Sequence, residues 1–216
     1  MGCLITFCGL DGCGKTSMIN MLHAYLAAKE IPVFITAQPT ETMRKSEVFR
    51  EFIDNPAPQK YDYRSLTLFT AGDRLQHSNK VIEPILKRGV TVLSDRYFYS
   101  CIANHRANGY KDDTWLREIF TNVPEPDLAF FLDVDVETAV YRVRQRPNER
   151  NRWIDIQLWE RLRKEYATLA EEYDGYLVPS GKNTEETFKS VRTHVDELLE
   201  KVQTDKNRRY LYANGQ

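Results

Sequence analysis

Short apolar runs alternate with longer amphipathic stretches along the whole chain. The runs predict buried strands at residues 4–8, 33–36, 90–94, 128–132 and 176–178. The stretches between them predict helices at residues 15–30, about 42–52, about 63–88, 115–120, 136–146, 156–173 and 185–202. Strands and helices in regular alternation predict an α/β fold, here a five-stranded parallel sheet flanked by helices. Ligands of such sheets bind at the carboxyl ends of the strands, so the residues that follow each strand carry the candidate chemistry.

The first apolar run leads directly into the sequence GLDGCGKTS, which fits the pattern G-x-x-x-x-G-K-[ST]. A glycine-rich loop between a strand and a helix turns backbone N–H groups inward as a nest for phosphate oxygens. Lys15 can reach the outer phosphates, and the Thr16 hydroxyl can coordinate Mg²⁺. A chance glycine-rich turn is disfavoured because a strand precedes the motif and a helix follows it. We predict a nucleoside triphosphate site at Gly9, Leu10, Asp11, Gly12, Cys13, Gly14, Lys15 and Thr16.

Composition narrows the class of protein. The 216 residues fit one domain, predicted over residues 1–203, and periodicity is lost in a tail at 204–216. The net charge of -1 gives no electrostatic case for a nucleic-acid or membrane partner, and no apolar run is long enough to span a bilayer. The four cysteines form no C-x-x-C pair, so reduced thiols in a cytoplasmic protein are expected rather than zinc ligands or disulfides.

The ends of the third and fourth strands carry acidic residues. Asp95 lies at the end of the third strand, which places its carboxylate beside the phosphate loop. This is the usual place for an acid associated with Mg²⁺. Arg96 follows it and can face a second phosphate. An N-cap role for Asp95 is the alternative. Asp135 is instead read as a helix cap, because Glu137 and Thr138 follow it in a first helical turn.

A cluster of arginines follows the fourth strand, in the sequence YRVRQRPNERNRW. Pro147 ends the helix, which places Arg150 and Arg152 on a short loop. Arg144 is expected to be a solvated surface residue. A mobile loop at about 146–154 can close over a triphosphate and bring cations onto the transferred phosphoryl group. We therefore predict a lid.

Four blocks, in order and spacing, resemble the thymidylate kinases, a branch of the P-loop nucleoside monophosphate kinases: GLDGCGKT, GDRLQHSNKVIEPILKRGVTVLSDRYFYS, PDLAFFLDVDVETAVYRVRQR and RLRKEYATLAEEY. The resemblance covers residues 4 to about 200. It implies transfer of a phosphoryl group from ATP with Mg²⁺ to dTMP, giving ADP and dTDP. It also implies a homodimer formed through the helices that flank the sheet. The apolar positions Leu66, Phe69 and Leu75 are compatible with that interface and equally with core packing.

The resemblance implies a role for each matching residue. Lys15 and Thr16 hold the triphosphate and the metal, and Asp95 assists the metal. The remaining roles concern the two nucleotides and the lid: Asp11 near the sugar 3′-hydroxyl, Arg96 on the acceptor phosphate, Arg74 on the pyrimidine edge, Phe69 and Asn104 at the acceptor, Arg142 near the adenine, and Arg146, Arg150 and Arg152 in the lid.

The chain departs from the family pattern at the acceptor site. Ala37-Gln38-Pro39 stands where many members have Arg-Glu-Pro, so one cation is absent, and Arg44 can replace it. Thr70 occupies the place of the usual stacking Phe, with Phe69 beside it. The family pattern also has other residues at the positions of Cys101, Asn104 and His105. Two alternatives therefore stay open: a kinase of the same scaffold acting on another nucleotide, a nucleoside or a small alcohol, and a nucleotide-binding module without transfer chemistry.

Overall fold

The computed structural model describes residues 2–55, 59–181 and 183–214, with side chains placed as far as Thr204. Five parallel strands form one sheet in the order β2-β3-β1-β4-β5. Their bounds are β1 Leu4–Cys8, β2 Val33–Ala37, β3 Thr91–Asp95, β4 Leu128–Asp133 and β5 Tyr176–Pro179. All five predicted strands and the parallel sheet are confirmed. The three central strands β1, β3 and β4 are almost entirely buried, whereas the edge strands β2 and β5 are partly exposed.

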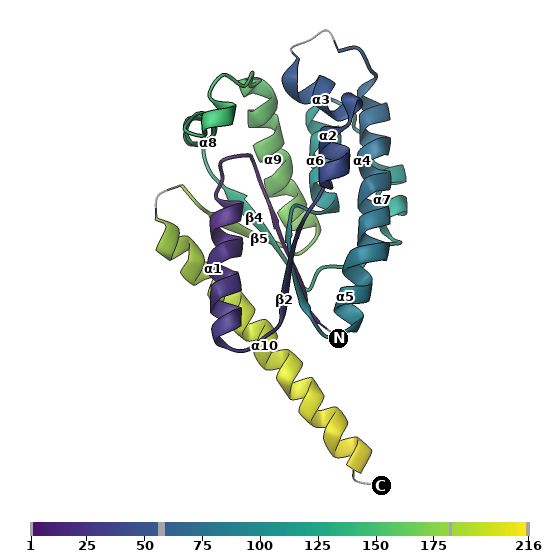
Figure 1. Cartoon of the computed structure of the whole chain (residues 1–216), viewed down its shortest axis with the longest axis vertical. Coiled ribbons are helices and arrows are strands. Elements are labelled where there is room, and N and C mark those ends of the chain that lie inside the picture. Colours follow the sequence, from purple (N-terminus) through teal and green to yellow (C-terminus); the bar gives the residue numbers. More distant parts are fainter. Residues whose placement is uncertain (1, 56–58, 182, 215–216) are drawn as a thin grey trace.

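Helices cover both faces of the sheet (Figure 1). The helix α1 (Lys15–Ala28) packs with α10 (Thr184–Asn214) on one side. On the other side α6 (Phe98–Ala107) packs between α4 (Tyr63–His77) and α9 (Ile156–Glu172). Shorter helices complete the chain: α2 Glu41–Lys45, α3 Glu47–Asp54, α5 Glu83–Lys87, α7 Thr114–Phe120 and α8 Val136–Arg144.

Two predicted helices are broken in the structure. The stretch predicted at 42–52 is divided at Ser46, whose hydroxyl caps α3 by accepting the N–H of Phe49 at 3.3 Å. The stretch predicted at 63–88 contains a π-helical turn, Ser78–Ile82, before α5. Pro84 lies in the first turn of α5 and has no N–H to donate to the preceding turn, which accounts for the wider winding there.

The helix α6 is absent from the sequence-based prediction. Eight of its ten residues are buried, because α4 and α9 cover it on both sides and the sheet lies beneath. A helix buried on nearly every side carries no amphipathic pattern, and its aromatic start, Phe98-Tyr99, also suits a strand.

The C-terminal helix passes through the predicted domain boundary. The helix predicted at 185–202 is longer in the structure, because α10 continues to Asn214 and extends away from the body (Figure 1). Residues 215 and 216 of the predicted tail lie outside the described residues. Within the described residues, no helix combines the length and the apolar character that crossing a membrane requires.

The strand register brings the candidate residues to one edge of the sheet. Phe7 on β1 pairs with Asp95 on β3, and Ala37 on β2 pairs with the same residue from the other side. The loop after β1, the Gln38 turn and Arg96 therefore meet at the carboxyl edge. The cis peptide bond between Gln38 and Pro39 shapes the turn after β2.

Candidate active site

The phosphate loop lies between β1 and α1, and two of its glycines are required by packing. A Cβ on Gly9 would lie 2.5 Å from the carbonyl oxygen of Leu132, and one on Gly12 would lie 2.4 Å from that of Ala139. Both residues also have positive φ. Gly14 has φ 101° and open space around it, so only its backbone conformation demands glycine. Gly9 and Gly12 therefore let the loop pack on β4 and α8.

Lys15 lies over the concave side of this loop. Its Nζ donates to the carbonyl oxygens of Leu10 at 2.8 Å and Gly9 at 3.3 Å, and the side chain is buried. Leu10 and Cys13 are buried in the core. These two residues can therefore offer a ligand only their backbone groups, while Lys15 offers a cation at the start of α1.

Asp11 joins the loop to two arginines from distant parts of the chain. Its Oδ1 accepts from Arg96 Nη2 at 2.6 Å and its Oδ2 accepts from Arg152 Nη1 at 2.9 Å. Burial opposes ionisation of Asp11, but Arg96, Lys15 and Arg152 outweigh it and lower the pKa of the carboxyl below its ordinary value. Asp11 is therefore a carboxylate that positions the two guanidinium groups.

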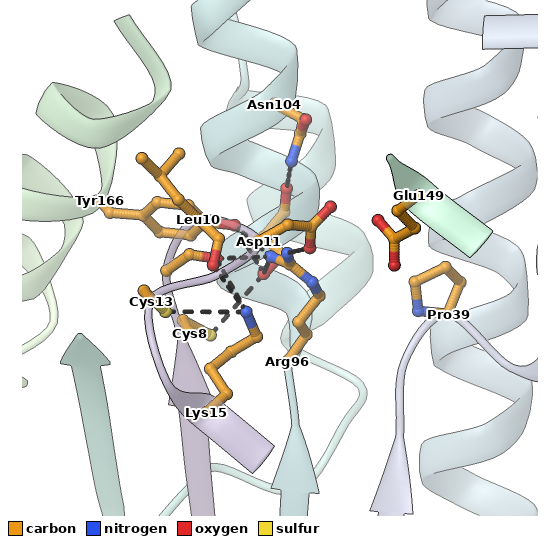
Figure 2. Close-up of polar contacts among 12 residues, drawn as sticks. Cys8, Leu10, Asp11, Cys13, Lys15, Pro39, Arg96, Asn104, Glu149 and Tyr166 are labelled. Carbon is orange, nitrogen blue, oxygen red and sulfur yellow. Dashed lines mark hydrogen bonds and ion pairs between the residues drawn. The ribbon is translucent and has the colours of Figure 1, made fainter. Parts of the chain in front are cut away.

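Arg96 is held from three directions. It adopts φ 69°, and its Nη1 donates to the carbonyl oxygen of Gly9 at 2.9 Å and to the hydroxyl of Tyr166 at 2.7 Å. Figure 2 shows its side chain rising from the end of β3 to Asp11, with Tyr166 reaching the same loop from α9. Burial raises the pKa of Tyr166 to about 12, so its phenol stays neutral. A left-handed conformation at a non-glycine residue is uncommon, and these contacts stabilise it here.

A cavity of about 400 Å³ opens over these groups. It is positively charged on several sides, since Lys15, Arg44, Arg96, Arg142 and Arg146 all contribute. The other residues that line it are Asp11, Gly12, Cys13, Gly14, Thr16, Ser17, Met18, Asp95, Ser180, Thr184 and Thr187. The structure thus brings most of the predicted donor-side residues together around one space.

The arginines after β4 have different positions. Arg142 donates to the carbonyl oxygens of Gly12 at 3.3 Å, Ser180 at 3.2 Å and Gly181 at 2.8 Å, and so ties the loop after β5 to the phosphate loop. In the predicted lid, Glu149 accepts from Arg146 at 3.0 Å and from Arg152 at 2.9 Å. Arg150 is exposed, as is Arg144.

The residues predicted at the acceptor site also differ in their burial and their contacts. Arg74 is buried, and donates to the carbonyl oxygens of Thr70 at 2.9 Å and Tyr97 at 3.3 Å. Asn104 is half-buried and donates to the carbonyl oxygen of Ser100. Phe69 is 57% exposed and, like Arg74 and Asn104, is not among the residues that line the cavity, so its place at the substrate stays a prediction. The helix turns this side chain outward.

Arg44 lines the cavity beside the Ala37-Gln38-Pro39 turn. Its Nε donates to the carbonyl oxygen of Pro39 at 2.9 Å, which aims the guanidinium at the cavity. Burial lowers the pKa of Arg44, and the neighbouring Arg96 lowers it further. Two guanidinium groups that repel each other across a cavity favour binding of an anion between them.

Sequence reasoning missed Tyr166, Ser100 and Glu149. Tyr166 lies on the buried stripe of α9 with Trp159, Leu162 and Leu169. A tyrosine on such a stripe needs a hydrogen-bond partner, and this signal was available in the sequence. It could not identify Ser100, whose hydroxyl accepts from Tyr166 at 3.0 Å, because that partner lies on the unpredicted α6.

Comparison with known proteins assigns the fold and the site to one family. Residues 7–191 match the family model described as thymidylate kinase. A probable thymidylate kinase from Pyrococcus horikoshii is 33% identical over 172 residues, which is 79% of this chain and 83% of that protein. A thymidylate kinase from Fervidobacterium nodosum is 31% identical over 183 residues, or 83% of this chain and 91% of that protein.

The chain belongs to the thymidylate kinase family. It is accordingly an ATP-dependent nucleoside monophosphate kinase, and its activity is the phosphorylation of dTMP. The predicted family, fold class and reaction are thereby confirmed. The non-catalytic binding module is no longer needed to explain the motif.

Proposed function

We propose that the family's reaction takes place between the phosphate loop, which holds ATP, and the arginines around Asp11, which hold dTMP. The observation that carries this proposal is the joining of Arg96 and Arg152 on one carboxylate of the phosphate loop. The products are ADP and dTDP. The contact sets a cation for the acceptor phosphate beside a cation for the transferred group, and no covalent intermediate is required.

On the donor side, the backbone N–H groups of the loop and the first turn of α1 bind the phosphates of ATP. Lys15 places its ammonium group against the outer phosphates, where negative charge increases during transfer. Arg142 holds Ser180 and Gly181 against Gly12, and this loop forms the platform for the adenine.

On the acceptor side, Arg96 and Arg44 bind the 5′-phosphate of dTMP from two directions. Arg74 hydrogen-bonds the pyrimidine edge, because two of its N–H groups are fixed by backbone carbonyls and its remaining N–H groups are available. Asp11 orients Arg96 and lies near the sugar. Binding of the lid arginines excludes water from the reacting phosphates and so limits hydrolysis of ATP.

Asp95 and Thr16 are the residues that would hold Mg²⁺. Among the described residues, Oδ1 of Asp95 is a buried oxygen with no hydrogen-bond partner, at the end of β3 beside the cavity. Thr16 carries its hydroxyl at the start of α1 on the same cavity. Oxygen donors of this kind suit Mg²⁺, which when bound neutralises charge on the phosphates.

An assay of ADP release tests the proposal directly. The acceptors to compare are dTMP, dUMP, dCMP, UMP, dGMP and thymidine, each at saturating ATP. We expect a strong preference for dTMP, because a site built to hydrogen-bond one base edge rejects others steeply. Equal turnover of several of these acceptors would contradict the assignment of the base site.

The Lys15→Ala variant tests the donor half separately. We expect kcat to fall by about 100-fold or more, since the ammonium group acts on developing charge. The melting temperature should change little, because the side chain contacts only loop atoms. Near-normal turnover in a folded variant would remove the donor assignment.

We also propose a cytoplasmic location and assembly with a second copy of the chain. All four cysteines are buried and no disulfide joins them within the described part of the chain, which is consistent with the proposed cytoplasmic location. The proposed partner, a second copy of the chain, has an exposed apolar surface available on α4, where Leu68 and Phe69 are 55% and 57% exposed.

A further inference from the structure

The turn after β2, residues 38–40, holds Arg44 through its main chain. Nε of Arg44 donates to the carbonyl oxygen of Pro39 at 2.9 Å, and Nη2 donates to that of Gln38 at 3.4 Å. Figure 2 shows Pro39 beyond the end of β2, beside the strand end that carries Arg96. Because Arg44 lines the cavity, the place of its guanidinium depends on where these two carbonyl groups lie.

The side chain of Gln38 is fully buried, which is unusual for a glutamine. Its backbone N–H donates to the carbonyl oxygen of Asp95 at 2.9 Å and so joins the turn to β3. Its Nε2 lies within hydrogen-bond distance of three groups: Oγ of Ser78 at 3.0 Å, Nδ1 of His77 at 3.2 Å and the carbonyl oxygen of Arg74 at 3.4 Å. One residue therefore ties the turn to β3, to α4 and to the π-helical turn.

The side-chain amide of Gln38 is held through its nitrogen. Burial lowers the pKa of His77, so its ring is neutral near pH 7 and can accept at Nδ1 while Nε2 donates to the hydroxyl of Thr36, 3.0 Å away. Oε1 of Gln38 is buried and has no hydrogen-bond partner among the described residues. A buried oxygen without a partner costs free energy, and departures of this kind are expected at functional sites.

A second contact fixes the same turn to α4. The N–H of Thr40 donates to Oδ2 of Asp73 at 2.8 Å, and its hydroxyl donates to Oδ1. Ser78, the partner of Gln38, begins the π-helical turn Ser78–Ile82, and such turns are frequent at functional sites. The segment that holds Arg44 is thus anchored on α4 at residue 38 and again at residue 40.

We infer that Gln38 is a positioning residue for the acceptor phosphate, because its buried amide fixes the turn whose carbonyl groups orient Arg44 in the cavity. This inference rests on the proposed function, in which Arg44 binds the 5′-phosphate of dTMP. Gln38 itself does not touch the nucleotide. Ala37 offers no cation at this edge of the sheet, and the turn beside it presents one from α2 instead.

A double-mutant cycle of Gln38→Leu and Arg44→Met tests the inference, because a positioning residue acts only through the residue that it positions. We expect Arg44→Met to raise KM for dTMP about 10- to 100-fold, as for loss of a charged hydrogen bond. Gln38→Leu should raise it about 3- to 10-fold. KM for ATP should stay unchanged in both variants. The double variant should have the KM for dTMP of Arg44→Met within about 2-fold.

Further measurements separate positioning from a general loosening of the fold. Thymidine, which has no phosphate, should inhibit Gln38→Leu and the original chain with the same Ki. Thr36→Val is the matched control, since it removes the other partner of His77 and leaves the turn intact, and its KM for dTMP should be unchanged. If melting curves show that Gln38→Leu is unfolded, Ser78→Ala replaces it in the cycle. This variant removes one acceptor of the same amide and should raise KM for dTMP about 3-fold.

The outcomes separate the inference from the proposed function. If Gln38→Leu leaves KM for dTMP unchanged, or if the effects of the two substitutions multiply in the double variant, the inference is wrong and the function stands. A Ki of thymidine that rises as much as KM for dTMP, or an equal effect of Thr36→Val, overturns the inference in the same way. If Arg44→Met itself leaves KM for dTMP unchanged, the proposed acceptor site is wrong and the inference falls with it.

Discussion

Asp11 accepts from Arg96 and Arg152 through its two oxygens, and these two contacts connect three segments that are far apart in the sequence. The side chain is 30% exposed, so solvent screens the pairs in part. Without the carboxylate, three cations around the loop would repel one another. Asp11 thus contributes to stability as well as to the arrangement of the site.

The Asp11→Asn substitution tests this contribution through its pH dependence. Because the folded-state pKa is lowered from 3.8, the carboxylate stabilises the fold fully above that value and less as the pH falls below it. We expect the variant to be less stable by on the order of 1 kcal/mol at pH 7. Urea unfolding of both chains between pH 7 and pH 3 should show this difference shrinking at the acid end, and a constant difference would contradict the role of the charge.

Tyr166 also positions Arg96, because its hydroxyl accepts from Arg96 and donates to Ser100. In Tyr166→Phe, Arg96 keeps Asp11 and Gly9 but loses one acceptor. We expect KM for dTMP to rise about 3- to 10-fold while KM for ATP stays within about 2-fold. Steady-state kinetics at varied dTMP and at varied ATP measure the two effects. Equal changes in both constants would show that Tyr166 supports the fold rather than the acceptor phosphate.

At the scale of elements, the sequence predicted those strands, loops and helix caps that a local pattern of residues determines. The strands and the phosphate loop follow from apolar runs and glycine spacing, and Asp135 caps α8 as expected, accepting the Thr138 N–H at 2.7 Å. The helix α6 was not predicted, because helices cover both of its sides and its sequence therefore lacks an amphipathic pattern. The outward position of Phe69 depends on how α4 packs, which no local pattern encodes.

In the predicted lid, residues that are close in the sequence have different contacts in the structure. Arg150 and Arg152 come from one short loop, yet only Arg152 contacts the phosphate loop, through Asp11. Glu149 pairs with both Arg146 and Arg152 and so fixes their spacing.

Substitution of the lid arginines tests their unequal roles. We expect Arg152→Ala to lower kcat on the order of 10³-fold, as for a cation that acts in the transition state, with a smaller change in KM. Arg150→Ala should also affect kcat more than KM, but by a smaller factor, because the side chain is exposed and lacks the Asp11 contact. Pre-steady-state measurement of the transfer step distinguishes chemistry from product release. A pure KM effect in both variants would remove the lid from the reaction.

At the scale of the whole molecule, the sheet order sets one edge for chemistry and leaves the outer faces of the helices for other contacts. The cavity is lined by residues at or after the ends of all five strands, whereas Leu68 and Phe69 project from α4 into solvent. Beside Leu68 lies a surface hollow lined by Asp62, Arg64, Ser65 and Trp115. An apolar surface with a polar rim is typical of an interface between protein chains.

Sedimentation velocity of the full chain tests whether this surface forms the proposed homodimer. One chain has a mass of 25.3 kDa, and we expect the unmodified chain to sediment with twice that mass. Phe69→Asp places a charge in the apolar contact and should yield the monomer without unfolding, because the side chain is exposed in the single chain. Tyr141→Asp is the matched control, since Tyr141 is 64% exposed on α8, and it should remain dimeric. A monomeric original chain, or a dimer that persists in Phe69→Asp, would exclude this face of α4 as the interface.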